Sequence, residues 1–340
     1  MLLAKVEKRR AEAVRRSLFA RDAVRKDLAI LEEQDSILIP LKENIDAETI
    51  REFGLELIEG ESHPRTFYRS PYEEIRDRIE IPDKLKSYLP DKWEKLGDVL
   101  VLKIPSELDD YEAQIAEIYA RVLRAKTVCR EVGIITGPYR EPNLKVIFGS
   151  ETETVHVENG IKYKLDVARI MFSSGNINER KRMSELECEG EMVIDMFAGI
   201  GYFTLPIAVY TNARKIIACE INPLSYRYLE ENIRLNHVES KVTAFLGDNR
   251  HLPGKGIADR IIMGYIGTTH HYLPKALELI KSGGTIHYHE TCPIDLFPEQ
   301  PMRRIDDAMN GRRYEIISVR EVKSYGPSTI HIVVDVRVLE

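Results

Sequence analysis

Short apolar runs alternate with amphipathic stretches throughout the second half of the chain. The first of five predicted strands begins at Val193, and the others occupy residues 215–220, 242–246, 259–267 and 284–291. Between the second and third strands, Tyr226, Leu229 and Ile233 recur at the spacing of one helix face. Two later runs, 314–322 and 330–339, flank a Ser-Tyr-Gly-Pro-Ser turn and predict an antiparallel hairpin. Strands that alternate with helices are typical of a parallel sheet, so we expect an α/β fold.

The first half of the chain has a less regular pattern. Residues 1–30 predict a short strand and then an amphipathic helix with Val14 and Leu18 inward, and residues 36–40 predict another strand. Four prolines interrupt residues 43–96, which we expect to be the least regular part. Further strands are predicted at 97–105, 144–148, 152–158 and 163–172, with a turn-rich connection at 134–142. We expect three parts, residues 1–95, 96–165 and 166–340.

The stretch Val193–Thr204 predicts a buried strand, a glycine turn and the start of a helix. Gly199 and Gly201 lack the side chains that would keep a ligand away from the backbone. A dinucleotide-binding turn has a third glycine where this chain has Thr204, and Asp195 would repel a pyrophosphate. An acid there suits a ligand that carries an amine, as S-adenosylmethionine does, and the D-x-F-x-G-x-G order is that of class I S-adenosylmethionine enzymes. An ordinary strand–turn–helix junction is the competing interpretation of this stretch alone.

Polar residues also follow the next two predicted strands. Glu220 ends the second, nineteen residues after Gly201, where an acid accepts hydrogen bonds from the ribose hydroxyls of an adenosine. Asp248 and Asn249 follow the third, where a carboxylate and an amide suit the edge of an adenine. The carboxyl ends of neighbouring parallel strands meet at one edge of a sheet. We therefore predict that Asp195, Glu220 and Asp248 belong to one binding site.

Composition narrows the class of protein. The chain has 340 residues, 43% of them hydrophobic, yet no apolar run approaches the roughly 20 residues of a membrane span. Its first residues lack the features of a signal peptide, so we expect a cytosolic protein. The four cysteines are scattered, which indicates neither a zinc site nor a disulfide framework. His287 and His289 lie two residues apart without an evident third ligand, so no metal is expected.

The net charge of -6 hides a basic N-terminus. Residues 1–30 contain nine Lys or Arg and four Asp or Glu, a local excess that suits contact with phosphates. An ordinary solvated helix face is the alternative interpretation.

Four segments carry a resemblance to a known family: residues 171–180, 193–204, 219–223 and 247–249. The chain resembles the archaeal tRNA-modifying group that contains the tRNA guanine-N1 methyltransferases of position 37. Within that group it looks most like their siblings, the wybutosine-pathway aminocarboxypropyltransferases. The distinguishing stretch is Gly264-Tyr265-Ile266. In the methyltransferase branch the sequence at these positions is similar to Asn-Leu-Pro, and the asparagine and proline help to hold the guanine.

The resemblance implies a fold and a reaction. The fold is a class I, Rossmann-like, seven-stranded and mostly parallel sheet with an antiparallel C-terminal hairpin, plus a smaller N-terminal α+β part. The reaction transfers the 3-amino-3-carboxypropyl group of S-adenosylmethionine to C7 of the tricyclic 4-demethylwyosine base at position 37 of tRNA(Phe), and releases methylthioadenosine. The implied partner is the anticodon stem-loop of tRNA(Phe), with no membrane and no obligate protein partner.

The resemblance also implies cofactor contacts. They are Ser174 and Lys181 at the methionyl end, Glu220 at the ribose, Asp248 and Asn249 at the adenine, and the turn residues Asp195, Gly199 and Gly201. The sulfonium activates both the methyl and the γ-carbon, so orientation should decide the product. Little acid–base help is needed, and if a side chain assists, Tyr265 and His289 are the candidates. The N-terminal half would bind tRNA, with residues 8–16 and 180–182 as candidate phosphate contacts.

Three alternatives stay open at this point. A methyltransferase acting on guanine N1, or on C7 of a wyosine, would use the same cofactor and nucleotide. A tRNA-binding protein without catalysis would have no need of Asp195, Glu220 and Asp248 together. A nicotinamide dehydrogenase is opposed by Thr204.

Overall fold

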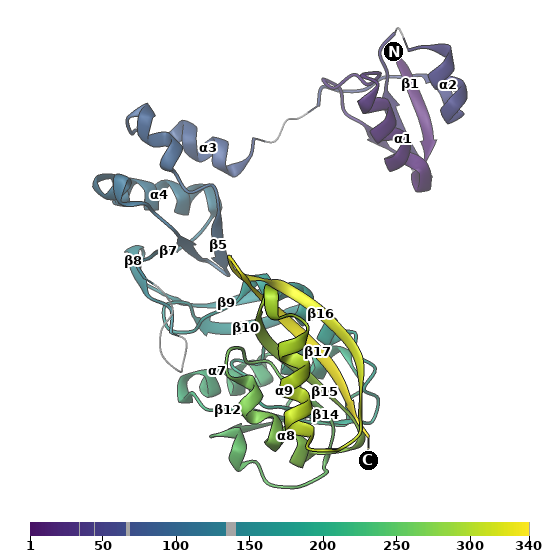
Figure 1. The fold of residues 1–340 in the computed structure, drawn as a ribbon. Helices are drawn as coiled ribbons and strands as arrows, with labels where there is room; N and C mark the ends of the chain where they lie inside the picture. The colour runs from purple at the N-terminus through teal and green to yellow at the C-terminus, as the bar shows by residue number, and fades with distance from the viewer. Residues whose placement is uncertain (34, 44, 66–68, 134–140, 340) are drawn as a thin grey trace. The chain divides into compact units, whose positions relative to one another are not determined.

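The described chain forms two compact units, Met1–Glu73 and Glu74–Glu340 (Figure 1). The structure is a computed structural model that describes residues 1–340 apart from 34, 44, 66–68, 134–140 and 340. Most of the turn-rich connection predicted at 134–142 lies outside the described residues. The three-part division expected from the sequence stays a prediction.

The N-terminal unit is an antiparallel sheet with a helix packed on it. Its strands are β1 (Leu2–Glu7), β2 (Leu31–Glu32), β3 (Ser36–Pro40) and β4 (Glu56–Glu59), in the order β2-β3-β1-β4. Helix α1 (Lys8–Ala20) packs on β1 and β3 and buries Val14 and Leu18, which confirms the predicted strand and amphipathic helix. Helix α2 (Ala47–Phe53) begins where the Asp46 carboxylate accepts from the Thr49 N–H.

Where they are described, residues 43–96 contain only short helices and strands. Besides α2 and β4, they contain α3 (Pro71–Arg78), the 3-10 turn η1 (Asp83–Tyr88) and β5 (Trp93–Leu96). As predicted, no long helix forms among these described residues, and Pro71 occupies the first turn of the short helix α3, a position that suits proline.

A second sheet and a hairpin precede the glycine turn. The sheet has the order β5-β6-β7-β8, with β6 (Val99–Leu102), β7 (Thr127–Glu131) and β8 (Leu144–Phe148). The 3-10 turn η2 (Ser106–Tyr111) and helix α4 (Glu112–Leu123) join the parallel pair β6 and β7. The hairpin consists of β9 (Glu153–Glu158) and β10 (Ile161–Asp166). The strand predicted at 163–172 is shorter, because the Asp166 carboxylate accepts hydrogen bonds from the Ala168 N–H and the Thr152 hydroxyl and turns the chain.

The C-terminal half is built on a seven-stranded sheet. Its order is β13-β12-β11-β14-β15-β17-β16. The strands are β11 (Met192–Asp195), β12 (Lys215–Glu220), β13 (Val242–Leu246), β14 (Ala258–Met263), β15 (Ile280–Pro293), β16 (Tyr314–Gly326) and β17 (Thr329–Val338). Strands β11 to β15 run parallel, whereas β17 is antiparallel to β15 and β16. The predicted class I fold with an antiparallel C-terminal hairpin is confirmed.

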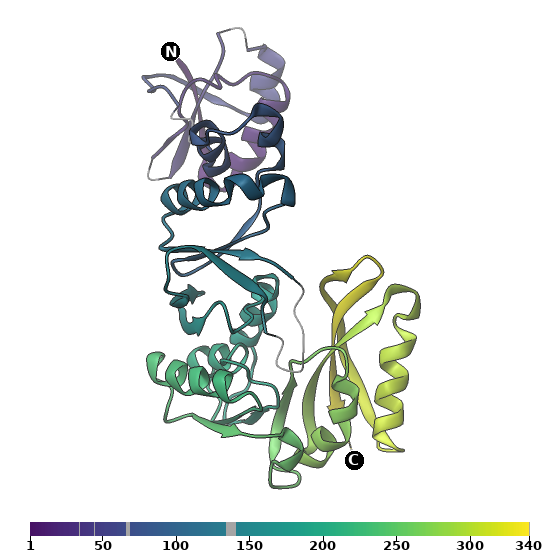
Figure 2. The same ribbon diagram turned by 90° about the vertical axis from the view of Figure 1, so that its left-hand side faces the viewer.

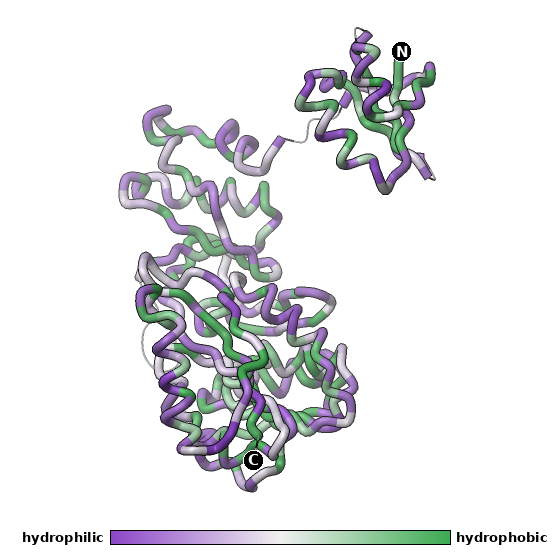
Figure 3. Tube along the Cα trace, turned by 45° about the vertical axis from the view of Figure 1, so that its right-hand side comes forward, coloured by the Kyte–Doolittle hydropathy of each residue, from purple (hydrophilic) through white to green (hydrophobic). Residues whose placement is uncertain are grey.

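Helices cover both faces of this sheet (Figure 2). Helices α5 (Ile177–Ser184), α6 (Thr204–Tyr210) and α7 (Pro223–Leu235) pack on one face, and α8 (Leu273–Leu279) and α9 (Glu299–Met309) on the other. Successive residues of β11 enter opposite cores, since Val193 belongs to the core that contains Leu229 and Ile194 to the core that contains Leu277. Burial on both faces explains the continuous apolar runs of these strands, visible as green stretches in Figure 3. No helix in the described part of the chain is long and apolar enough to cross a membrane.

Candidate active site

The glycine turn after β11 is held by Asp195. This side chain is fully buried, and its carboxylate accepts hydrogen bonds from the Phe197 N–H at 3.2 Å and from the Thr204 hydroxyl at 2.7 Å. Burial raises the pKa of Asp195 to about 6. Asp195 therefore fastens the start of α6 to the end of β11 from behind the turn. Thr204, which stands where a dinucleotide site has its third glycine, donates its hydroxyl hydrogen to Asp195.

The two glycines of the turn have different tasks. Their φ angles of +57° for Gly199 and +102° for Gly201 lie in the region that favours glycine. The Gly199 N–H donates to Oε2 of Glu220 at 2.8 Å, and the Asn222 N–H donates to Oε1 at 2.7 Å. A Cβ on Gly201 would lie 2.7 Å from Leu205, so this glycine permits close packing of the turn on α6. Gly199 thus orients Glu220, whereas Gly201 serves the core.

A cavity of about 730 Å³ opens in front of the turn, at the carboxyl ends of β12 and β14. Gly199, Glu220 and Tyr265, all predicted from the sequence, line it together. Burial raises the pKa of Glu220, and its carboxylate, which has about four lone-pair sites, keeps at least one of them beyond its three backbone contacts. The volume and the acceptor fit a nucleoside such as the adenosine of S-adenosylmethionine, because ribose hydroxyls are donors.

Aromatic rings form part of the cavity wall. Tyr265 stacks on Phe197 with ring centroids 5.2 Å apart and planes 19° apart, and Tyr272 meets Phe197 edge-on at 5.0 Å. Flat apolar faces of this kind suit the stacking of base rings. A Cβ on Gly264 would lie 2.6 Å from the Phe203 ring. Phe203 therefore leaves no room at position 264 for the asparagine of the methyltransferase pattern unless the ring moves.

A buried ion pair supports another wall of the cavity. Arg180 is 2% exposed, and its guanidinium donates to the Glu158 carboxylate at 2.5 and 2.6 Å and to the Ser173 carbonyl at 2.8 Å. The Arg182 guanidinium donates to the carboxylates of Glu179 on α5 and Asp335 on β17. The prediction that residues 180–182 contact RNA phosphates is wrong for these two arginines, because both guanidiniums already bind carboxylates inside the protein.

Two residues that the resemblance predicts to contact the cofactor, Ser174 and Lys181, are not among the residues that line the cavity. The Ser174 hydroxyl and N–H contact the Glu94 carboxylate, whose pKa is raised by burial. The Lys181 side chain is 64% exposed, with its Nζ 3.7 Å from Oε1 of Glu185. Adjacent residues of a helix point about 100° apart, so on α5 it is Arg180 and not Lys181 that faces the cavity.

The residues predicted at the adenine edge are also outside the lining. Asp248 accepts from the Arg250 N–H at 2.9 Å and forms an ion pair with its guanidinium, which holds the pKa of Asp248 below its usual range. Asn249 is buried, and its Nδ2 donates to the Met196 carbonyl at 2.9 Å. Its Oδ1 has no hydrogen-bond partner among the described residues. Asn249 thus braces the turn after β11 and keeps one buried acceptor.

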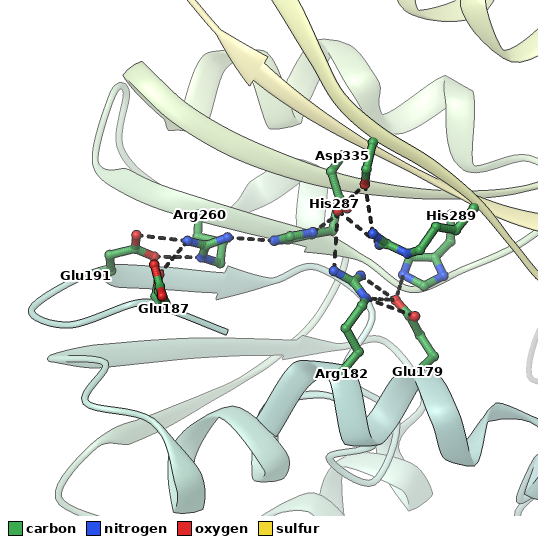
Figure 4. Close-up of polar contacts among 10 residues, drawn as sticks. Glu179, Arg182, Glu187, Glu191, Arg260, His287, His289 and Asp335 are labelled. Carbon is green, nitrogen blue, oxygen red and sulfur yellow. Dashed lines mark hydrogen bonds and ion pairs between the residues drawn. The ribbon is translucent and has the colours of Figure 1, made fainter. Parts of the chain in front are cut away.

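A chain of buried and partly buried polar side chains connects α5 with the sheet (Figure 4). The Arg260 guanidinium lies 2.7 Å from the Glu191 carboxylate and 2.8 Å from Nε2 of His287. Nδ1 of His287 lies 2.6 Å from the Asp335 carboxylate. Burial by itself would raise the pKa of Asp335, but its contacts with His287 and Arg182 hold that pKa well below the usual range. Among the described residues no group of three or more side chains could hold a metal ion.

His289 is the innermost member of this group. The ring is fully buried behind Phe203, on which it stacks at 5.2 Å, and its Nε2 lies 3.5 Å from Oε1 of Glu179. Burial and the charge of Arg182 lower the pKa of His289 to about 3. His289 is therefore neutral at physiological pH and does not touch the cavity itself.

The sequence interpretation missed His331, which lies in the cavity wall 3.1 Å from His289. It also missed Asp335, the partner of His287. The signal was present, because His331 and Asp335 are polar residues at even spacing on the apolar strand β17 and so share one buried face.

Comparison with known proteins places this geometry in a family. The model of the TRM5/TYW2 methyltransferase domain matches residues 154–317, that of the TYW2 N-terminal domain residues 75–152, and that of the tRNA methyltransferase 5 N-terminal domain residues 5–49. The chain is 48% identical to the tRNA(Phe) (4-demethylwyosine(37)-C(7)) aminocarboxypropyltransferase of Pyrococcus horikoshii, over 77% of this chain and 94% of that one. The chain belongs to the TRM5/TYW2 family. The kinship predicted from the four sequence segments is confirmed.

Solved structures of TRM5/TYW2 members show the same fold. Pyrococcus horikoshii TYW2 in complex with MeSAdo has a TM-score of 0.73 and 46% identity, and covers 79% of this chain and 99% of its own. Trm5b from Pyrococcus abyssi has a TM-score of 0.73 and 35% identity over all of both chains. The TYW2 match thus leaves out part of this chain, whereas the Trm5b match extends over the N-terminal unit as well.

Proposed function

We propose that this chain transfers the 3-amino-3-carboxypropyl group of S-adenosylmethionine to C7 of 4-demethylwyosine at position 37 of tRNA(Phe). The observation that carries the proposal is the 48% identity to a relative of that name over almost its whole length. Three features of the cavity agree with it: the oriented carboxylate of Glu220, the aromatic wall, and Gly264 packed under Phe203. The released product is methylthioadenosine, and the aminocarboxypropyl donor needs no metal.

The cofactor site we propose follows from the cavity. Glu220 binds the ribose and Gly199 brings the backbone close to the ligand, whereas Asn249, which lies outside the cavity lining, stays a prediction from the resemblance. Asp195 and Gly201 support the turn, and Asp248 and Ser174 stay predictions from the resemblance. Lys181 likewise stays a prediction from the resemblance; its ammonium lies beside Glu185 and outside the cavity lining.

The RNA partner we propose is the anticodon stem-loop of tRNA(Phe), in the cytoplasm. The solved structure of a related protein is a complex of aTrm5 and tRNA(Leu), which supports tRNA as the class of substrate. The basic segment at residues 8–16 is part of this proposal, although Arg15 and Arg16 bind Glu12 within α1.

Two forms of labelled S-adenosylmethionine test the proposal. The protein is incubated with tRNA(Phe) that carries the tricyclic base and with cofactor labelled either in the carboxyl group or in the methyl group. Carboxyl label is expected in the tRNA, at a nucleoside whose mass has gained one aminocarboxypropyl group. Methyl label in the tRNA would refute the proposal.

A methyltransferase acting at position 37 is the second candidate. It is supported by one specific observation, the 36% identity to Trm5b of Pyrococcus abyssi over 99% of both chains. Incubation with tRNA that carries an unmodified guanosine at position 37 separates the two. We expect no transfer of either label to that tRNA.

A further inference from the structure

The turn between β16 and β17 lies at the same edge of the sheet as the glycine turn. Strand β16 runs parallel to β15, because each of these two strands is antiparallel to β17. Its carboxyl end therefore lies at the edge where the other parallel strands end and where the cavity opens. Lys323, Ser324 and Tyr325, which lead into the turn, all line that cavity.

A bulge in β16 explains why three successive residues line the cavity. In a regular strand, successive side chains point to opposite faces of the sheet. Here Ser324 pairs with Ile330 and Gly326 pairs with Thr329, so that Tyr325 is an extra residue between two neighbouring pairs. An extra residue of this kind redirects a side chain. Tyr325 therefore lines the cavity together with both residues that precede it.

Tyr325 belongs to the cavity and to the molecular surface at once. The residue lines the cavity and is 51% exposed. Within the described part of the chain, its hydroxyl makes no hydrogen bond and its ring stacks on no other aromatic ring. The flat ring is therefore accessible to a ligand that also reaches into the cavity.

Two lysines add positive charge to the same lining, Lys103 and Lys323. The Lys103 side chain is 81% exposed, with its Nζ 3.4 Å from Oε1 of Glu131. The Lys323 ammonium donates to the Ser173 hydroxyl at 2.7 Å. Ammonium groups and an accessible aromatic ring in one site are typical of surfaces that bind single-stranded RNA, because the charge attracts phosphates and the ring stacks on bases.

The proposed reaction leaves a nucleotide of the RNA without a stacking neighbour. C7 of the base at position 37 can reach the cofactor only when that base leaves the stack of its loop and enters the cavity. The adjacent nucleotide then loses one of the bases on which it stacked. An aromatic side chain at the edge of the cavity can replace the missing base, since every base has a flat face that stacks on such a ring.

We propose that Tyr325 stacks on the base of the loop nucleotide adjacent to position 37 and so holds the tRNA with its target base in the cavity. The two lysines attract the phosphates of the same loop. Tyr325 binds the RNA and takes no part in bond formation, so its loss should raise the KM for tRNA more than it lowers kcat. The inference rests on the proposed function.

A fluorescent base tests this contact directly. 2-Aminopurine, whose fluorescence is quenched by stacking, replaces the nucleotide on the 5′ side or on the 3′ side of position 37 in tRNA(Phe) that carries the tricyclic base. The tRNA is mixed with the protein and methylthioadenosine, so that no transfer occurs. At one of the two positions the fluorescence should stay low with the wild type and with Tyr325→Phe. It should rise with Tyr325→Ala and with Tyr325→Leu, because leucine is apolar but not flat.

Kinetics and cofactor binding separate stacking from other roles. In Tyr325→Ala and Tyr325→Leu the KM for tRNA should rise about 10- to 100-fold, whereas Tyr325→Phe should keep the wild-type value. The calorimetric affinity for S-adenosylmethionine should be unchanged in all three variants. Tyr88→Ala is the matched control, at a residue that is 45% exposed and outside the described lining, and it should bind tRNA and react like the wild type.

The outcomes are distinct. Equal fluorescence with the wild type and Tyr325→Ala at both positions, or a wild-type KM in Tyr325→Leu, would overturn the role of Tyr325. A loss of affinity for S-adenosylmethionine in Tyr325→Ala would also overturn it, since the ring would then contact the cofactor. If the wild-type protein transfers no carboxyl label, the proposed function fails, whereas the fluorescence measurement needs no transfer and still tests the stacking.

Discussion

Replacing Asp195 by asparagine is expected to change how stability depends on pH. The carboxyl group is fully buried, and its pKa of about 6 in the folded protein lies above the ordinary value of 3.8. Asparagine has nearly the same shape and keeps an oxygen for the Phe197 N–H, while the Thr204 hydroxyl can turn and accept from the new amide. The substitution therefore removes the titration and keeps these two hydrogen bonds.

The sign of the effect follows from the raised pKa. A group whose folded pKa is raised contributes stability below its unfolded pKa and loses that contribution as the pH rises through the folded value. The difference between 3.8 and about 6 is about 2 pKa units, and each unit is worth about 1.4 kcal/mol, so the loss is about 3 kcal/mol. The free energy of unfolding of Asp195→Asn, relative to that of the wild type, should rise by this amount between about pH 4 and pH 8.

Urea unfolding at several pH values measures this difference. Trp93, the only tryptophan, lies in the same compact unit as Asp195, so its fluorescence reports the unfolding of that unit. Asp91→Asn, at an exposed position in the same unit, is the matched control and should show no pH-dependent difference. A difference between Asp195→Asn and the wild type that stays constant from pH 4 to pH 8 would refute the assignment of a raised pKa to Asp195.

Three further substitutions test the cavity. Glu220→Gln should weaken binding of S-adenosylmethionine about 10- to 100-fold in calorimetry, because a charged acceptor is lost, whereas the exposed Glu239→Gln should bind normally; equal affinities would remove Glu220 from the site. Arg180→Met should lower the free energy of unfolding by about 3–5 kcal/mol, since Glu158 is left buried and unpaired, and the added Glu158→Leu should recover most of it in urea titrations. If the single variant is as stable as the wild type, the ion pair is not formed in solution. Gly264→Ala should lower stability by about 1–3 kcal/mol in thermal unfolding, because its Cβ would strike Phe203, and an unchanged midpoint would show that the ring moves freely.

Local sequence was sufficient for the central sheet and for part of the site. Apolar runs mark strands that are buried on both faces, and glycines with positive φ mark the turn, because both features depend on neighbours in the chain. Glu220 and Gly199 were found because a parallel sheet brings the ends of consecutive strands to one edge. The prolines of residues 43–96 correctly indicated the absence of a long helix among the described residues there, since proline is tolerated at a helix start and not in its interior.

Only the tertiary structure decided which side chains face the cavity. Arg180 and Lys181 are adjacent basic residues, and the rotation of α5 turns one inward onto Glu158 and leaves the other in solvent beside Glu185. His331 lies 42 residues after His289 in the sequence. Glu179 lies far before both, on α5. The pairing register of β15 with β17, together with the packing of α5 on that sheet face, brings these three side chains into contact. Such contacts are long-range, so no local pattern of residues could have specified them.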